Sequence, residues 1–332
     1  MTRRRAFLAA GLATVVIAGI ASSVWAQEKY PTKPIKIVVG FEAGGPADVY
    51  ARLLADHMSK SLGQPTIVEN VPGAGTMLAG GQVARAAPDG YTLFFNTNTT
   101  YTNLLLYKDV PYTAESFEPV GLMYSGAAFI VAPPDSPFSS LEDLIKHARE
   151  HPGELDFSTT GLGGYVHLTG EHFNSVFGVE TVAVSYGSGA AALQGVMSGE
   201  VDFSFIGAAA AVPQIHAKKV KPLAVTEPDR IPDLPDVPTV DEVAMNMGLE
   251  DPNWDTGSWY GLLAPAGTPA DIVDILNKEL VAFVATEEVQ KRLAAEGNVG
   301  GGDMSPAEFK EYIAADTATW EKVIKTRGVK IE

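Results

Sequence analysis

Residues 35–52, IKIVVGFEAGGPADVYAR, are the stretch that decides the fold class of this chain. They begin with a short apolar run rich in β-branched residues, which is typical of a strand covered on both faces of a parallel sheet. Gly44 and Gly45 then permit a tight turn, and Pro46 and Asp48 suit the first turn of a helix. The stretch therefore predicts a strand that runs through a glycine loop directly into a helix.

The loop between this strand and this helix is a candidate anion site. A helix start presents unpaired N–H donors and a partial positive charge. The loop contains no lysine or arginine, so a bound anion would be held by backbone dipoles. An ordinary strand-to-helix turn without a ligand is the alternative for this loop taken alone. The candidate residues are Phe41, Ala43, Gly44, Gly45 and Asp48.

The N-terminal residues predict export. Residues 1–26 combine three arginines at positions 3–5, an apolar run over 6–21 and a small-residue cleavage site at 24–26. We expect cleavage near Ala26, so that the mature chain starts at Gln27. Positions 4–8 also fit the twin-arginine pattern loosely, and both export routes stay open. An uncleaved membrane anchor is the weaker alternative, and no other apolar stretch reaches the ~18 residues of a membrane helix.

The mature chain is acidic and contains no cysteine. Without the three arginines of the signal, 21 of the 24 basic residues remain against 40 acidic ones, which gives a net charge of −19. This charge disfavours a nucleic acid or an anionic membrane as partner. The absence of cysteine excludes a disulfide framework, thiolate metal sites and a cysteine nucleophile.

Length and element pattern predict two α/β domains, each with a parallel-rich sheet flanked by helices. The 332 residues minus the 26 of the signal leave 306, which is too many for one comfortable core. Strands and helices alternate nearly throughout, which indicates parallel sheets. We place the first domain at 27–123 plus 261–332 and the second at 124–260. Further strands are expected at 66–69, 91–95, 155–159, 181–184 and 201–206, with helices ending near 87 and spanning 140–149, 167–173 and 190–197.

The C-terminal part shows two explicit helix starts. Thr268-Pro269 and Ser305-Pro306 each place a capping hydroxyl before a proline at the first helical position. Apolar residues then recur at helical spacing along both helices. The two expected buried faces consist of Ile272, Ile275, Leu276, Leu280, Phe283 and Val284, and of Phe309, Ile313, Thr317, Trp320 and Ile324.

No metal, nucleotide or catalytic motif stands out. The six histidines show no ligand spacing such as HExxH, although His147 and His151 are four residues apart near a helix end. Neither a dinucleotide fingerprint nor a GxxxxGK[ST] motif is present, so no cofactor is expected. Residues 186–189, YGSG, match the GxSxG nucleophile elbow only in part. The alternative of a secreted hydrolase would use Ser188 or Ser158 with His167.

Polar and glycine-rich loops follow several of the expected strands. Because open α/β sheets bind small molecules at the carboxyl ends of their strands, these loops form the expected ligand site. Hydroxyls, amides and helix N-termini without a cationic side chain suit a carboxylate held by neutral donors. Each loop taken singly could also be an ordinary connection. Besides the first loop, the candidates are Asn96, Thr97, Ser158, Thr159, Thr160, Gly163, Gly164, His167, Tyr186 and Gly207.

With these residues in view, the chain resembles the solute-binding proteins of the tripartite tricarboxylate transporter system, the Bug family. The resemblance implies a two-domain periplasmic binding protein, type II-like, that closes on a small carboxylate-bearing solute. It also implies a non-catalytic protein that delivers this solute to membrane transporter subunits, and we expect a monomer. The resembling stretches are GGxxDxxAR at 44–52, VENxPGAG at 68–75, APDGY at 87–91, HLxxE at 167–171 and WYGLxAPAGTP at 259–269.

Two positions depart from the family pattern. Residues 161–164 are GLGG where the family usually has Gly-x-Gly-Ser, and residues 185–188 are SYGS where Pro-Tyr-Lys-Gly is usual. The first change removes a hydroxyl and the second a lysine, both where the resemblance places the far half of the ligand. We hypothesise a ligand with a larger or less anionic far end, for example an aromatic one. A sensor subunit that presents the same closed form to a signalling receptor is a further alternative.

Overall fold

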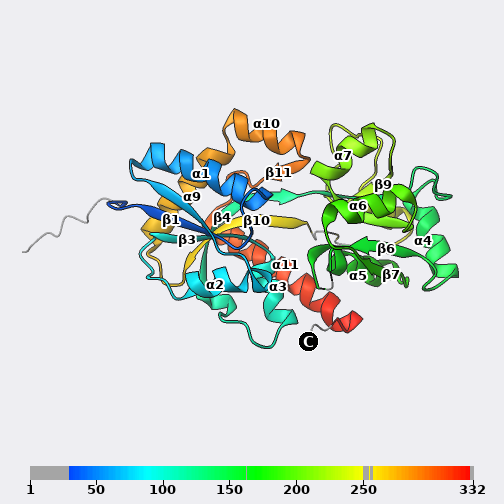
Figure 1. Cartoon of the computed structure of the whole chain (residues 1–332), viewed down its shortest axis with the longest axis horizontal. Coiled ribbons are helices and arrows are strands. Elements are labelled where there is room, and N and C mark those ends of the chain that lie inside the picture. Colours follow the sequence, from blue (N-terminus) through cyan, green and yellow to red (C-terminus); the bar gives the residue numbers. More distant parts are fainter. Residues whose placement is uncertain (1–29, 162, 250–253, 255–256, 330–332) are drawn as a thin grey trace, which may run out of the picture.

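The computed structural model describes residues 30–161, 163–249, 254 and 257–329. The chain forms two mixed β-sheets, each flanked by helices, and Figure 1 shows the two halves side by side. The predicted class, α/β with two helix-flanked sheets, is confirmed. The predicted export signal lies outside the described residues. Of the helices in the described ranges, none is long and apolar enough to cross a membrane.

The first sheet has the strand order β11-β4-β10-β3-β1-β2. β1 pairs in parallel with β2 and β3, whereas β10 pairs antiparallel with β3 and β4, and β11 pairs antiparallel with β4. The strand bounds are β1 (Ile35–Val39), β2 (Thr66–Asn70), β3 (Thr92–Thr97), β4 (Phe117–Gly126), β10 (Ser258–Pro265) and β11 (Asn298–Gly300).

Helices cover both faces of the first sheet because β1 is apolar on both sides. Ile35 and Ile37 belong to a core with α1 and α9, while Val38 belongs to a second core with α2. The predicted strand, loop and helix of residues 35–52 are thus confirmed. The helix bounds in this half are α1 (Pro46–Leu62), α2 (Met77–Ala84), α3 (Thr99–Leu106), α9 (Ala270–Val284) and α10 (Glu287–Ala295), with short 3-10 turns η1 (Ala74–Thr76) and η2 (Ala114–Ser116).

The second sheet has the order β7-β6-β8-β5-β9. β6 pairs in parallel with β7 and β8, and β5 pairs antiparallel with β8 and β9. One core lies under α4, α5 and α8, and another under α6 and α7. The bounds are β5 (Ala128–Ala132), β6 (Asp156–Thr159), β7 (Val182–Ser185), β8 (Phe203–Gly207), β9 (Lys221–Val225), α4 (Leu141–Glu150), α5 (Tyr165–Phe177), α6 (Gly189–Ser198), α7 (Ala208–His216) and α8 (Val240–Asn246).

The chain crosses between the sheets twice. β4 ends at Gly126 and β5 begins at Ala128, so a single residue separates the two sheets on the outward crossing. The return crossing leads into β10 at Ser258. The predicted domain limits after 123 and after 260 fall inside β4 and β10, which both belong to the first sheet along their whole length. The division into domains stays a prediction at the level of single residues.

Helix α11 (Pro306–Arg327) contacts both halves. Phe309 and Ile313 are buried in the core of the first half, as predicted from their spacing. Farther along, Trp320 packs with Leu106 of α3 and Leu168 of α5, so the helix leaves one half and docks on the other. With a rise of about 1.5 Å per residue, its 22 residues span roughly 33 Å. Figure 1 shows α11 running from the first sheet to the side of α5.

Short-range signals locate the elements that were predicted, with two differences, whereas strands β4, β5, β9, β10 and β11 were not predicted. Every strand predicted from the sequence is present within two residues of its expected bounds. The capping box at Ser305 and Glu308 is confirmed. At Thr268 the capping prediction is wrong, because its hydroxyl donates to the Pro265 carbonyl at 2.7 Å and Pro269 occupies the cap position of α9. The helix expected to end near 87 ends at Ala84.

A buried carboxylate anchors α11 to the return strand. Asp316 is 5% exposed. Its Oδ2 accepts from Nε1 of Trp259 at 3.0 Å, and its Oδ1 accepts from Nε1 of Trp320 at 2.8 Å. Trp259 and Trp320 are themselves fully buried. One side chain therefore satisfies two indole N–H donors that have no access to water.

We expect Asp316→Ala to lower the free energy of unfolding by about 3 kcal/mol, because it strands two buried donors. Urea denaturation of the variant and of the wild-type protein measures this difference. Glu311→Ala is the matched control, since Glu311 is exposed on the same helix and its loss should change stability by about 0.5 kcal/mol at most. Equal stability of the two variants would show that the Asp316 bridge is dispensable.

His172 lies on α5 where that helix meets α11. Its ring is 4.6 Å from Trp254 and 6.3 Å from Trp320, measured between centroids, and the residue is 6% exposed. Among the described residues, neither ring nitrogen has a hydrogen-bond partner. Burial, assisted by the charge of Lys322, lowers the pKa of His172 from 6.5 to about 4. The folded state therefore favours the neutral ring.

This lowered pKa predicts a loss of stability in mild acid. Neutral His172 contributes fully to the free energy of unfolding above pH 6.5. This contribution is lost as the pH falls from 6.5 to about 4, because the unfolded chain takes up the proton first. We expect the fall in unfolding free energy between pH 7 and pH 4 to be larger in the wild type than in His172→Phe, by on the order of 3 kcal/mol. Denaturant titrations at both pH values provide the test. Parallel pH profiles of the two proteins would contradict this assignment.

Candidate functional site

The register of the strands brings both predicted loop sets to the boundary between the halves. Thr97, at the carboxyl end of β3, pairs with Tyr260 of β10, which pairs with Tyr124 of β4. On the other side, Gly207 at the carboxyl end of β8 pairs with Ala128 of β5. Only a few residues of chain separate positions 124 and 128. The carboxyl ends of the parallel strands in both sheets therefore face the same boundary, where open α/β sheets bind ligands.

The first glycine loop is braced by Asp48. The N–H of Gly44 donates to Asp48 Oδ2 at 2.9 Å, and Arg52 Nε donates to the same oxygen at 3.0 Å. Burial alone would raise the pKa of Asp48, but the hydrogen bonds from Arg52 and Gly44 lower it overall. Gly44 has a φ of 88°, a left-handed conformation that suits glycine. The Asp48 carboxylate and the Arg52 guanidinium are thus committed to holding the loop.

A pocket of about 320 Å³ opens beside this loop. Its size falls in the range typical of small-molecule sites. Tyr260, which the sequence analysis did not name as a site residue, forms one wall and stacks on Tyr124 with ring centroids 4.6 Å apart. The only signal for it in the sequence was its place at the return crossing. The lining residues are Phe41, Glu42, Ala43, Gly45, Pro46, Ala47 and Tyr260.

Asn96 and Thr97 belong to a buried hydroxyl network behind the first loop. Asn96 Nδ2 donates to the hydroxyls of Thr76 at 3.0 Å and Thr100 at 2.8 Å. The hydroxyls of Thr97 and Thr99 are 2.8 Å apart. A Cβ on Gly40 would lie 2.6 Å from Cβ of Thr76, so the network packs directly against the start of the loop. Asn96 and Thr97 thus support the loop from behind. The sequence analysis missed Thr76, which is 20 positions from Asn96, and it also missed the local partners Thr99 and Thr100.

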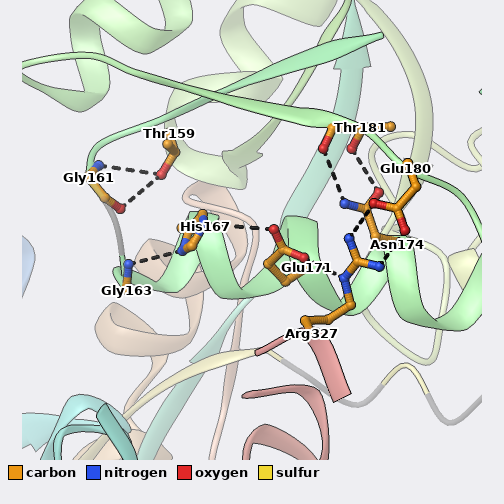
Figure 2. Close-up of polar contacts among 9 residues, drawn as sticks. All are labelled: Thr159, Gly161, Gly163, His167, Glu171, Asn174, Glu180, Thr181 and Arg327. Atoms are coloured by element: carbon orange, nitrogen blue, oxygen red, sulfur yellow. Dashed lines mark hydrogen bonds and ion pairs between the residues drawn. The ribbon is translucent and has the colours of Figure 1, made fainter. Parts of the chain in front are cut away.

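The second glycine loop joins β6 to α5. The Thr159 hydroxyl donates to the Gly161 carbonyl at 3.2 Å, and the Gly163 N–H donates to His167 Nδ1 at 3.0 Å, as Figure 2 shows. Gly164 occupies the cap position of α5 and has no side chain to fill it. Thr160 is exposed. This loop therefore presents a hydroxyl and a helix N-terminus at the boundary between the halves.

His167 supports this loop as a neutral ring. Because Nδ1 accepts from Gly163, the ring proton sits on Nε2, which lies 3.8 Å from Oε1 of Glu171. Burial lowers the pKa of His167, and the nearby Glu171 offsets this only in part. The ring is 7% exposed. His167 is the third residue of α5, and from there its ring reaches back to the N–H of Gly163 just before the helix.

Three further candidates take different places. The Ser158 hydroxyl is fully buried and lies 2.5 Å from that of Ser204 in the second sheet. The Tyr186 ring lies over Gly195 of α6, and its hydroxyl donates to Glu200 at 3.3 Å. Gly207 is exposed at the cap position of α7. Of these three, only Gly207 offers an open backbone position at the boundary.

The structure does not bring together the residues that the hydrolase alternative would use. Ser188 accepts from the Ala191 N–H as the cap of α6, and Ser158 is engaged with Ser204. His167 contacts Gly163 and Glu171 instead. The other histidine pair, His147 and His151, flanks Glu154 at 3.2 and 3.3 Å. Within the part of the chain that the structure describes, no group of three or more metal-ligating side chains could hold a metal ion.

Comparison with known proteins identifies the family. The family described as "Tripartite tricarboxylate transporter family receptor" matches residues 50–329. A relative from Pseudomonas sp. strain P51, named "UPF0065 protein in tcbD-tcbE intergenic region", is 35% identical over 94% of this chain and 92% of its own length. Protein BugT of Bordetella pertussis is 30% identical over 100% of this chain and 99% of its own.

Solved structures of similar proteins agree with this family assignment. "R. palustris Rpa4515 with adipate" has a TM-score of 0.74 and 34% identity, covering 91% of this chain and 99% of the other. "MatC (Rpa3494) from Rhodopseudomonas palustris with bound malate" has a TM-score of 0.72 and 31% identity, covering 89% and 100%. The predicted resemblance is confirmed. The chain belongs to the tripartite tricarboxylate transporter family receptors, which are periplasmic solute-binding proteins of the Bug type and not enzymes.

Proposed function

We propose that this protein captures a small carboxylate-bearing solute between its two halves and delivers it to the membrane subunits of a tripartite tricarboxylate-type transporter. One observation carries the proposal: a glycine loop from each half leads into a helix N-terminus at the shared boundary. Backbone N–H groups at such positions favour a carboxylate without needing a cationic side chain. Binding would draw the two halves together around the β4 and β10 crossings.

The chemistry of the pocket supports an anion held by neutral donors. Arg52 is paired with Asp48, and the described residues that line the pocket beside the first loop include neither lysine nor arginine. Glu42 and Tyr260 do line it, so the walls are acidic and aromatic. A second negative charge on the ligand would therefore gain little here. This agrees with the hypothesis of a larger or less anionic far end, which also rests on Gly164 and Gly187.

The named ligands of two neighbours support the ligand class. The solved structures of Rpa4515 and MatC carry adipate and malate, which are both small carboxylates. We propose the same class for this chain, with Phe41, Ala43, Gly44, Gly45 and Thr160 nearest the solute, together with Gly163, Gly164 and Gly207. Asp48, Asn96, Thr97, Thr159 and His167 would act through the loops that they hold. Of the site residues predicted from the sequence, Ser158 and Tyr186 have the least support, because their hydroxyls contact Ser204 and Glu200.

Membership of a periplasmic binding protein family supports the remaining expectations. We propose that residues 1–26 direct export and are removed near Ala26, so that the mature protein works in the periplasm as a monomer. The match to the transporter receptor family covers residues 50–329, most of that mature chain. Delivery to membrane subunits follows from that membership as a proposal.

A thermal-shift titration of the chain from Gln27 onward tests the ligand class. We expect one class of carboxylate among adipate, malate, citrate and benzoate to raise the melting temperature with dose. At ~100 times its Kd a ligand stabilises the folded state by roughly 2.7 kcal/mol. The corresponding uncharged amides are the controls and should give no shift. No response to any acid would refute the proposed class, and tighter binding of malate than of benzoate would refute the aromatic far end.

A pair of matched glycine variants tests the first loop. Gly44 has a φ of 88° and Gly199 a φ of 76°, and a Cβ at either position would meet no atom within 4 Å. Alanine should therefore strain both positions equally, by about 1 kcal/mol. We expect Gly44→Ala to weaken binding of the carboxylate found by titration about tenfold, while Gly199→Ala, at the end of α6, leaves affinity unchanged. Calorimetric titration measures both. Equal affinities would remove this loop from the site.

A further inference from the structure

Arg327, the last residue of α11, forms ion pairs with two glutamates of the second half. Arg327 Nε lies 2.7 Å from Oε2 of Glu171, and its two terminal nitrogens donate to the two oxygens of Glu180 at 2.8 Å each. The side chains of Arg327 and Glu171 are only 19% and 16% exposed, so solvent screens their contact weakly. The hydrogen bond to Glu180 is the main cause of a raised pKa for Arg327. The guanidinium is therefore charged at any physiological pH.

Glu171 passes this contact on to the second glycine loop. While its Oε2 faces Arg327, its Oε1 faces Nε2 of His167 at 3.8 Å, an electrostatic contact longer than a direct hydrogen bond. On the other edge of the ring, Nδ1 accepts from the Gly163 N–H at 3.0 Å. Figure 2 shows the four residues in sequence, from the end of α11 to the loop. We call Arg327, Glu171, His167 and Gly163 the relay.

The two ends of the relay belong to different halves. Arg327 sits on a helix whose first turns are buried in the core of the first half and whose middle is anchored by Asp316. Gly163 lies in the loop between β6 and α5, at a φ of 74°, one residue before the cap of α5. A carboxylate that orients an imidazole fixes which ring nitrogen carries the proton. The carboxylate that faces Nε2 of His167 is therefore itself held by a residue from the other half.

We propose that Arg327 and Glu171 are positioning residues of the binding site, which set the Gly163 loop through His167 and so couple that loop to the docking of α11. The importance of this loop for a ligand rests on the proposed function, whereas the coupling itself does not. With Arg327 in place, the Glu171 carboxylate is held with one oxygen toward the ring. Without it, the carboxylate is free to turn to solvent, and the ring loses the partner that keeps Nδ1 as an acceptor.

Amide hydrogen exchange of Gly163 in the unliganded protein, resolved by NMR, tests the coupling. His167→Gln moves the side-chain acceptor away from the Nδ1 position, and we expect exchange at Gly163 to accelerate about tenfold. His167→Asn restores an oxygen near that position and should remain within about threefold of the wild type. Arg327→Gln substitutes no residue of the loop or of α5, and it should accelerate exchange at Gly163 at least threefold.

Arg149→Gln is the matched control. Arg149 Nε donates to the Phe177 carbonyl at the end of α5 at 3.0 Å, so this variant also removes an arginine contact to α5 but leaves the relay intact. We expect wild-type exchange at Gly163 in this variant. If Arg327→Gln behaves like Arg149→Gln while His167→Gln accelerates exchange, the relay stops at His167 and the proposal is overturned. If both arginine variants accelerate exchange equally, the effect is a general loosening of α5, which also overturns it.

Adipate affinity, measured by calorimetry on the same variants, separates this proposal from the proposed function. We expect Arg327→Gln to bind adipate three- to tenfold more weakly than Arg149→Gln. If the wild-type protein binds no adipate, the exchange measurements on the unliganded protein still decide the coupling. Accelerated exchange in Arg327→Gln with unchanged adipate affinity would show that the relay sets the loop but that the loop does not position the ligand, which would refute the binding-site role.

Discussion

The hydrogen bonds of Asp316 to two buried indoles are the interaction on which the arrangement of the two halves depends. Trp259 belongs to the strand that returns to the first sheet, and Trp320 belongs to the part of α11 that docks on α5. A buried carboxylate is costly unless its oxygens are satisfied, and here each oxygen has a specific indole donor. The requirement fixes both the rotation of α11 and its place along β10. The far end of the helix is thereby aimed at the second half.

Most polar side chains near the boundary hold loops rather than face open space. Asp48 holds the first loop through Gly44, Asn96 and its threonine neighbours fill the space behind it, and His167 holds the second loop through Gly163. Exposed at the two loops are backbone, the Glu42 side chain and the Thr160 hydroxyl, beside the N-termini of α1 and α5. Pre-organised donors of this kind lower the cost of ordering a site when a ligand binds. The arrangement suits a receptor that must bind and release one solute repeatedly.

The charge distribution of the protein is compatible with attraction of an anionic solute at short range only. A net charge of −16 over the whole chain repels an anion at a distance. Arg52 is paired with Asp48, and Arg327 is paired with Glu171 and Glu180. In the proposed site, attraction would come from dipoles at the helix starts, which act within about one helical turn. An acidic, aromatic pocket wall formed by Glu42 and Tyr260 adds a preference about the rest of the ligand. Selectivity in this family member is therefore expected to reside in the far half of the solute.

The sequence alone determined the α/β class, the strands of the parallel pairings, the glycine loops and the cap at Ser305. These features depend on neighbours within a few residues, through side-chain alternation, glycine conformation and capping hydrogen bonds. Only the tertiary structure decided that Tyr260 walls the pocket, that Ser158 and Tyr186 turn to other partners, and that Arg327 reaches Glu171. These contacts join residues far apart in the chain, such as the 156 positions between Glu171 and Arg327. Their geometry is set by strand register and helix docking, because no local pattern records which distant surface a side chain will meet.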